Sequence, residues 1–117
     1  MCGIVGFQGN IGNISEIDKV IKLMMNSIRY RGPDSCGNWV DPEHEIVMAH
    51  QRLSIIDLSK SGHQPMTSKN ERYVISFNGE VYNYRSLRKE LEVLGIKFSS
   101  LSDTEVLLES FAYWGIE

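Results

Sequence analysis

Apolar residues recur along the chain with a period of two in some stretches and of 3.6 in others, and these periods predict where strands and helices lie. Residues 2–8 (CGIVGFQ) form a short apolar run, which is typical of a buried strand. A helix follows, because apolar residues from Ile14 to Ile28 recur at spacings of three and four. Asn13 is its predicted N-cap, with Glu16 three residues on. The turn at 31–34 (RGPD) is expected to end this helix.

The middle of the chain is predicted to consist of strands and turns. The polar stretch 59–71 predicts a loop, and Asn78-Gly79 is the commonest signal for a two-residue hairpin turn, with 80–82 after it. Short strands are expected at 36–40, 45–49 and 53–57. The stretch 72–77 (RYVISF) predicts another strand, because it is rich in β-branched and aromatic residues.

Two helices are predicted near the end of the chain. Leu87, Leu91 and Leu94 mark one face of the first helix, which lies between Asn83 and Gly95. Ser102-x-x-Glu105 is a capping box that begins the second, and Gly115 ends it. The expected apolar face of this second helix is Val106, Leu107, Phe111 and Trp114. Because most strands precede these helices, the predicted fold class is α+β in one domain.

Composition narrows the function classes. The 117 residues are 42% apolar and 23% charged, which excludes a disordered chain. The net charge of −3 argues against a protein that binds nucleic acid by neutralising phosphates. No apolar run is long enough to span a membrane, and the first ten residues do not resemble a signal peptide. We therefore expect a cytoplasmic protein that works in a reducing compartment.

Two cysteines, Cys2 and Cys36, are too few for a disulfide framework. The three histidines are scattered and there is no CxxC pair, so no metal site is predicted. Phosphate-binding glycine motifs are absent too. If Met1 is removed, however, Cys2 carries both a thiol and the free α-amine, which makes it a nucleophile with its own base. The alternative is that Cys2 is a small buried apolar residue.

Six segments favour the catalytic interpretation. In chain order they are MCGIVGF, YRGPDSCG, AHQRLSIIDLS, GHQPM, FNGEVYNY and SDTEVLL. Together they resemble the glutaminase domain of class II glutamine amidotransferases, and within that family the asparagine synthetase branch. The resemblance extends from Met1 to Glu117. It implies a fold of the N-terminal-nucleophile hydrolase type, a four-layer α/β/β/α sandwich with antiparallel sheets.

The resemblance also assigns catalytic roles. Cys2 would attack the side-chain amide of glutamine, form a thioester and release ammonia, and its free amine would carry the proton to that ammonia. The Asn78 side-chain amide and the Gly79 backbone N–H would form the oxyanion hole. Two fixed donors of this kind suit acyl transfer. The hairpin interpretation of Asn78-Gly79 is compatible with this role, because a tight turn exposes both donors.

Further residues would bind glutamine by resemblance. Arg52 would hold the α-carboxylate and Asp103 the α-ammonium, with Glu80 and Ile56 in the same substrate site. The alternatives are a solvated strand-end arginine for Arg52 and a helix N-terminal residue for Asp103.

Residues 31–37 resemble a mobile loop that closes over glutamine, although an ordinary surface turn remains an alternative. His50 is expected to be packed or hydrogen-bonded rather than a catalytic base, because the α-amine already serves as the base.

The resemblance suggests that residues 1–117 are the leading part of a longer glutaminase domain. The synthetase domain that would use ATP, magnesium and the ammonia is absent from these residues, and we expect no cofactor in this chain. The predicted function is therefore glutamine hydrolysis that supplies ammonia to an asparagine-synthetase-type amidation, with aspartate as the first candidate acceptor. The expected partners are glutamine, the synthetase domain and further copies of the chain that cover open strand edges. The alternative function is a non-catalytic glutamine-binding or interaction module.

Overall fold

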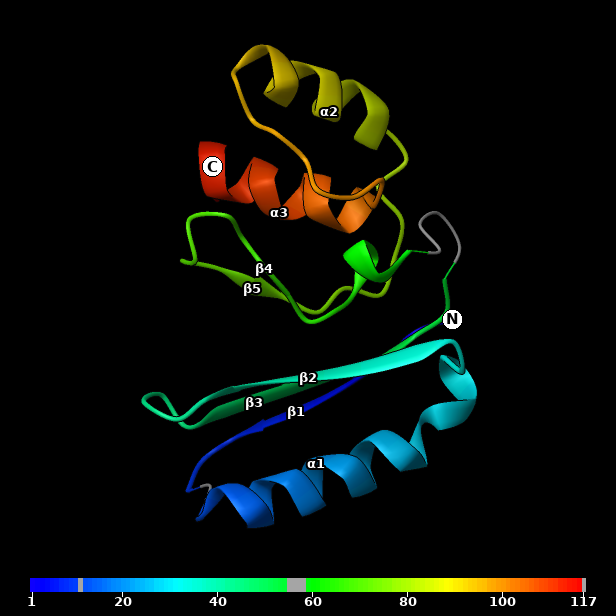
Figure 1. Ribbon diagram of the computed structural model, residues 1–117, viewed down its shortest axis with the longest axis vertical. Coiled ribbons are helices and arrows are strands. Elements are labelled where there is room, and N and C mark those ends of the chain that lie inside the picture. The colour runs from blue at the N-terminus through cyan, green and yellow to red at the C-terminus, as the bar shows by residue number, and fades with distance from the viewer. Residues whose placement is uncertain (11, 55–58, 117) are drawn as a thin grey trace. The chain divides into compact units, whose positions relative to one another are not determined.

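A computed structural model describes residues 1–10, 12–54 and 59–116, which form an α+β fold with antiparallel sheets (Figure 1). The α+β prediction is thus confirmed. The described residues divide into two compact units. The first unit holds residues 1–54, 63–65 and 76–78, and the second holds 59–62, 66–75 and 79–116.

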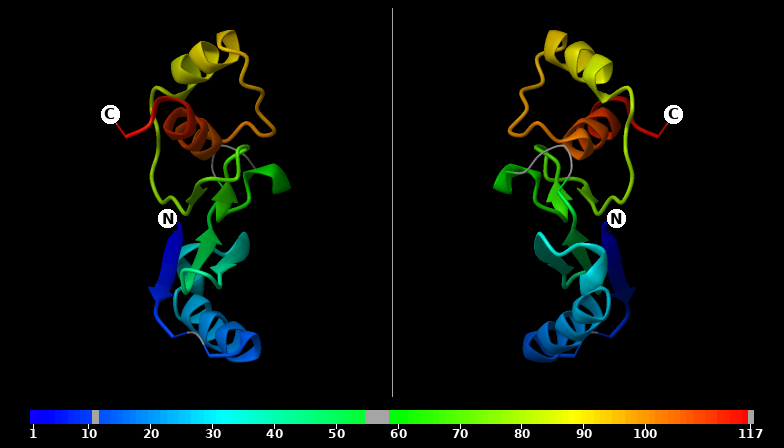
Figure 2. Two further views of the ribbon diagram at one scale, coloured as in Figure 1. Left: turned by 90° about the vertical axis from the view of Figure 1, so that its left-hand side faces the viewer. Right: turned by 90° about the vertical axis from the view of Figure 1, so that its right-hand side faces the viewer.

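The first unit is a three-stranded antiparallel sheet covered by one helix (Figure 2). Strand β3 (Ile46–Arg52) lies between β1 (Gly3–Gln8) and β2 (Ser35–Asp41). Helix α1 (Ile14–Ser27) packs on one face of this sheet. The core of the unit consists of Ile17, Ile21 and Met25 from α1 with Val47 and Ala49 from β3.

The beginning of α1 follows the prediction. The side chain of Asn13 accepts a hydrogen bond from the backbone N–H of Glu16 at 3.0 Å, which satisfies one of the free donors of the first turn. After α1 a single 3₁₀ turn, η1 (Arg29–Arg31), leads toward β2.

Strand β3 is longer than predicted, and the expected separate strand at 53–57 is wrong for its first two residues. The expected strand at 45–49 is part of β3, which continues to Arg52 because β1 and β2 supply partners that far, through the pairs Gly3–Gln51 and Ser35–Arg52. Leu53 and Ser54 lie beyond these partners and are not in a strand. Residues 55–57 lie outside the described residues.

The second unit has a two-stranded sheet and two helices. Strand β4 (Met66–Thr67) pairs with β5 (Val74–Ile75), and a 3₁₀ turn, η2 (Lys60–Gly62), precedes them. Helix α2 (Tyr84–Val93) lies beside α3 (Asp103–Trp114) (Figures 1 and 2). The buried apolar residues of this helix pair are Leu91, Val106 and Leu108.

Three predictions about the middle of the chain are wrong. The expected loop at 59–71 contains η2 and β4, and the expected strand at 72–77 is reduced to Val74–Ile75. No hairpin forms at Asn78-Gly79, because β5 turns back to pair with β4 and residues 80–82 are not in a strand. The two predicted oxyanion donors, the Asn78 side-chain amide and the Gly79 backbone N–H, therefore lie in irregular chain that precedes α2.

The helix ends are close to the prediction, with one difference in the capping. Gly95 and Gly115 follow α2 and α3 with φ of +91° and +82°, a region that favours glycine. Ser102 caps α3 by accepting from Thr104 N–H at 3.1 Å. Glu105 does not complete the capping box, because its carboxylate binds backbone N–H groups earlier in the chain than Ser102.

The apolar face of α3 also differs from the prediction. Val106 is buried, Leu107 and Phe111 are half-buried, and Leu108 is more buried than either. Trp114, at 45% exposed, is largely outside the core. No helix among the described residues has the length and apolar character that crossing a membrane requires.

A matched pair of substitutions on α1 tests the core of the first unit. Ile21 is fully buried, so Ile21→Ala is expected to lower the free energy of unfolding by about 2–5 kcal/mol. Leu23, on the same helix, is 71% exposed, so Leu23→Ala should change it by less than about 0.5 kcal/mol. Urea denaturation followed by circular dichroism measures both values. Equal losses in the two variants would show that this core is assigned wrongly.

Candidate active site

Cys2 lies just before β1, at the same end of the sheet as the last residues of β3. The register that pairs Gly3 with Gln51 places Cys2 across from Arg52, one step further along. The Cys2 sulfur accepts a hydrogen bond from Leu53 N–H at 3.3 Å and donates to the Leu53 carbonyl oxygen at 3.6 Å. Arg31 Nε donates to the Cys2 carbonyl at 3.2 Å. The thiol is therefore held by backbone groups that directly follow the central strand.

The surroundings of Cys2 suit a reactive thiol. Cys2 is half-buried, unlike an inert core cysteine, and the adjoining Met1 is 73% exposed. Cys36, the other cysteine, is exposed on β2, and both are free thiols. The N–H of Leu53 points at the sulfur, and a thiolate at this position can accept a hydrogen bond from it.

Gly3 explains how the chain can pass so close to the end of α1. A Cβ atom on Gly3 would lie 2.7 Å from Ile28 Cδ1, so a larger residue here would require the Ile28 side chain to move. Gly32 is confined more severely, because its added Cβ would overlap the carbonyl of Gln51 and the nitrogen of Arg52. Because neither residue has a side chain, Ile28 can pack against Gly3 and the backbone of β3 can pack against Gly32 at this end of the sheet.

Arg52 is the last residue of β3 and is buried, at 8% exposed. The alternative of a solvated strand-end arginine is therefore wrong. Its carbonyl oxygen accepts from Asp34 N–H at 3.0 Å, and Asp34 Oδ2 accepts from Ser54 N–H at 2.7 Å. These bonds tie the 31–37 segment to the end of β3.

Only part of the 31–37 segment is a turn. Residues 35–37 belong to β2, where Ser35 pairs with Arg52 and Gly37 with His50. The interpretation as an ordinary surface turn therefore applies to residues 32–34 at most, and Gly32 is itself buried. Closure of the segment over a substrate stays a prediction.

His50 lies in β3, two residues before Arg52, and is fully buried. Its Nδ1 is 2.9 Å from the Ser76 hydroxyl, while Nε2 is buried and has no hydrogen-bond partner among the described residues. Burial, with the positive charges of Arg52 and His63 as further causes, lowers the pKa of His50 to about 4. His50 is therefore neutral at pH 7, and the prediction that it is packed and hydrogen-bonded is confirmed.

The two predicted oxyanion donors lie at a boundary in the chain. Asn78 is the last residue of the first unit, and Gly79 begins a segment of the second. Both are exposed, as is Glu80. The residue before Asn78 is anchored in the first unit, because Phe77 N–H donates to Gln64 Oε1 at 2.7 Å.

Asp103, in the second unit, is the first residue of α3 and is 7% exposed. Its Oδ2 accepts a hydrogen bond from the backbone N–H of Val81 at 2.9 Å, a contact that the sequence pattern did not reveal. The helix N-cap is Ser102, so Asp103 is the next residue rather than the cap.

The predicted site residues are thus distributed over the two units. Cys2, Arg52 and Asn78 belong to the first, where Cys2 and Arg52 meet at the end of the sheet. Gly79, Glu80 and Asp103 belong to the second, where Asp103 holds Val81, two residues after Gly79. Ile56 lies outside the described residues. In those ranges no three His, Cys, Asp or Glu side chains gather as a metal-binding cluster.

Comparison with known proteins shows which family the chain belongs to. A family model described as a glutamine amidotransferase domain matches residues 1–117. Two proteins of Bacillus subtilis (strain 168) are named asparagine synthetase [glutamine-hydrolyzing] 1 and 3. Their sequences are 44% and 40% identical to this one, over alignments that cover 97% of the chain. A protein of Gibberella zeae named amidase chry2 is 31% identical over 99% of it. In all three the chain corresponds to only 18% of the relative's length.

The pKa of His50 predicts how stability changes with acid. The unfolded histidine binds a proton near pH 6.5 and the folded one near pH 4, so the unfolded state holds more protons between these values. Stability should therefore fall on acidification through this window, by about 3 kcal/mol from this group. In His50→Gln this contribution should disappear, which denaturant unfolding at pH 7 and pH 4.5 would measure.

His44 provides the control for this experiment. It is exposed beside Asp41, which raises its pKa, so it is unable to cause the acid loss. His44→Gln should keep the wild-type decrease in stability between pH 7 and pH 4.5. A decrease that persists in His50→Gln would contradict the assignment to His50.

Proposed function

Because the chain belongs to the glutamine amidotransferase domain family, we propose that it performs the glutamine-hydrolysing half-reaction, in which glutamine and water give glutamate and ammonia. The observation that carries this proposal is the position of Cys2. It lies next to an exposed Met1, and its sulfur is held by Leu53 at the end of the sheet that also carries Arg52.

In the proposed reaction, removal of Met1 frees the α-amine of Cys2. The sulfur attacks the side-chain carbonyl carbon of glutamine, a C–S bond forms, and the C–N bond breaks. The proton lost by the thiol travels through the α-amine to the departing nitrogen, which leaves as ammonia. Water then hydrolyses the thioester to glutamate and restores the thiol.

Asn78 and Gly79 are the proposed oxyanion donors, through the side-chain amide and the backbone N–H respectively. Both residues are exposed and neither is in a helix or strand, which supports the availability of these donors to a substrate. Each such donor typically contributes about 10²–10³ to the rate.

Glutamine itself is the proposed ligand of Arg52, Asp103, Glu80 and Ile56. The guanidinium of Arg52 suits the α-carboxylate, and the carboxylates of Asp103 and Glu80 suit the α-ammonium. Two features support this pairing. Arg52 lies across from Cys2 in the register, and Asp103 is a buried carboxylate that accepts from Val81 N–H, next to Glu80.

The larger setting is also proposed from the family. The chain would be the leading part of an N-terminal-nucleophile sandwich domain, with residues 31–37 as its lid. It spans about a fifth of the length of relatives named asparagine synthetases. A synthetase region that uses ATP and magnesium would receive the ammonia, with aspartate as the first candidate acceptor, in the cytoplasm. Further copies of the chain would cover open strand edges.

The two cysteines offer a direct test of the nucleophile. Cys2→Ala is expected to reduce glutaminase activity by about 10³-fold or more, because no other thiol takes its place. Cys36→Ala removes the other thiol, which lies in the proposed lid, and its activity should stay far above that of Cys2→Ala. Glutamate release is measured for both, and the intact mass of the active protein should lack Met1. Full activity in Cys2→Ala, or an active protein that retains Met1, would overturn the proposal, and so would glutamine binding without turnover in calorimetry.

Two substitutions separate the contacts of Asp103. Asp103→Asn keeps an oxygen for Val81 N–H but removes the charge, so KM for glutamine should rise by about 10-fold or more with kcat nearly unchanged. Asp103→Ala also leaves Val81 N–H without its acceptor, and kcat should then fall as the Gly79 segment loosens. Steady-state kinetics give both constants. Identical constants in the two variants would show that the Val81 contact has no part in catalysis.

A further inference from the structure

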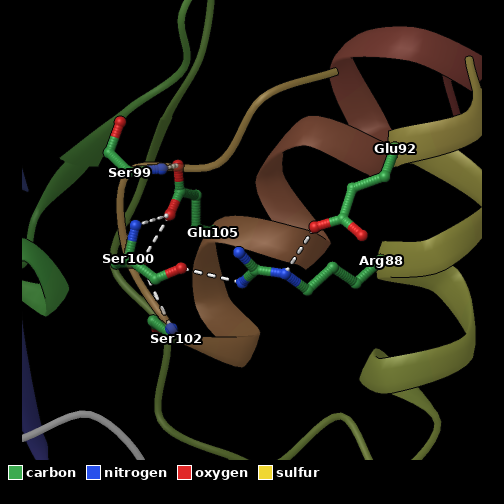
Figure 3. A network of polar contacts seen from close by, with 6 residues as sticks. All are labelled: Arg88, Glu92, Ser99, Ser100, Ser102 and Glu105. Atoms are coloured by element: carbon green, nitrogen blue, oxygen red, sulfur yellow. Dashed lines mark hydrogen bonds and ion pairs between the residues drawn. The ribbon is translucent and has the colours of Figure 1, made fainter. Parts of the chain in front are cut away.

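The loop before α3 is built around one buried carboxylate, that of Glu105 (Figure 3). Glu105 is 5% exposed. Its Oε1 accepts from Ser99 N–H at 2.8 Å, and its Oε2 accepts from Ser100 N–H at 2.7 Å and from the Ser100 hydroxyl. The hydroxyl oxygen of Ser100 then accepts from Ser102 N–H at 3.2 Å. A capping-box glutamate would bind the N–H of Ser102 alone, so this carboxylate organises more of the loop than helix capping requires.

Arg88 on α2 holds the same loop from the other side (Figure 3). Its guanidinium donates to the Ser100 carbonyl oxygen at 2.7 Å and to Glu92 at 3.0 Å, and it lies 4.5 Å from the centre of the Phe98 ring. The N–H, the hydroxyl and the carbonyl of Ser100 are therefore all bonded. Such full satisfaction of a buried polar network gives a loop one conformation.

This loop leads directly to Asp103. Ser102, bonded to Ser100, caps α3, and Asp103 is the next residue. Hydrogen bonds connect Glu105 to Ser102, the chain continues from Ser102 to Asp103, and the Asp103 carboxylate accepts from Val81 N–H, so Glu105 is linked to the chain beside Glu80. All of these residues lie in the second unit.

We propose that Glu105 is a positioning residue for the glutamine α-ammonium: it fixes the 99–102 loop and thereby the direction of the Asp103 carboxylate. The proposal rests on the function proposed for Asp103. Precise placement of a charge matters because a displacement of about 1 Å can cost as much as 10²-fold in rate.

A second buried glutamate on the same helix provides a matched control. Glu109 lies one turn after Glu105, is also 5% exposed and also accepts a backbone N–H, that of Lys69 at 2.9 Å. Its partner is remote in sequence from the 99–102 loop. Both Glu→Gln variants should lower stability, because a glutamine has one acceptor oxygen where the carboxylate has two.

The kinetic experiment compares Glu105→Gln with Glu109→Gln. Glu105→Gln should raise KM for glutamine by roughly 10–10²-fold with kcat within a few-fold of wild type. Glu109→Gln should leave KM within about two-fold. Arg88→Lys, which keeps the charge but loses the two-armed contact, should raise KM less than Glu105→Gln does and serves if that variant fails to fold. An equal rise in KM in both glutamate variants would overturn the proposal.

A second measurement does not depend on turnover. Amide hydrogen exchange at Val81 reports its bond to Asp103, and it should be faster in Glu105→Gln but not in Glu109→Gln. Unchanged exchange at Val81 in Glu105→Gln would overturn the proposal even if KM changed. If wild-type protein proved unable to hydrolyse glutamine, the proposed function would fail, while faster exchange in Glu105→Gln alone would still support the positioning of Asp103.

Discussion

The double pairing of β3 is the constraint on which the first unit depends. This strand is hydrogen-bonded along its length to β1 on one side and β2 on the other, and its Val47 and Ala49 contribute the sheet side of the core. Because side chains alternate across a strand, the same register directs His50 and Arg52 to the opposite face from α1. The position of Cys2 follows from that register, since only the pairing with β3 brings residue 2 to Leu53.

Helix α3 organises the second unit as β3 organises the first, but it does so through carboxylates that accept backbone hydrogen bonds. Three acidic residues in its first two turns, Asp103, Glu105 and Glu109, are buried and accept backbone N–H groups from separate stretches of chain. Buried carboxylates are costly unless hydrogen-bonded, and here each is. The helix thus organises the chain at 69, 81 and 99–100. This role goes beyond the favourable interaction of an acidic side chain with the helix dipole.

Local signals predicted the elements well where one interaction decides them. The Asn13 cap and the glycines after α2 and α3 are of this kind, and so is the apolar period of α1. Prediction was wrong where pairing partners decide, as in the extension of β3 to Arg52 and the absence of a hairpin at Asn78-Gly79. The candidate site residues came from the resemblance of the segments around Cys2 and Asp103, and their roles stay predictions. The contacts of Asp103 with Val81 and of Glu105 with Ser99 link remote positions and leave no periodic pattern.

The 51-residue separation between Cys2 and Leu53 has a consequence for synthesis on the ribosome. The first strand to be made has its partner only in the third, and chain closure over that distance carries an entropic cost that local structure does not repay. Helix α1 and its cap can begin to form as soon as they emerge, whereas the N-terminal segment has no sheet to join until β3 has been translated. During that interval β1 is without its partner strand, so the hydrogen bond that holds the Cys2 sulfur forms only after Leu53 has been made.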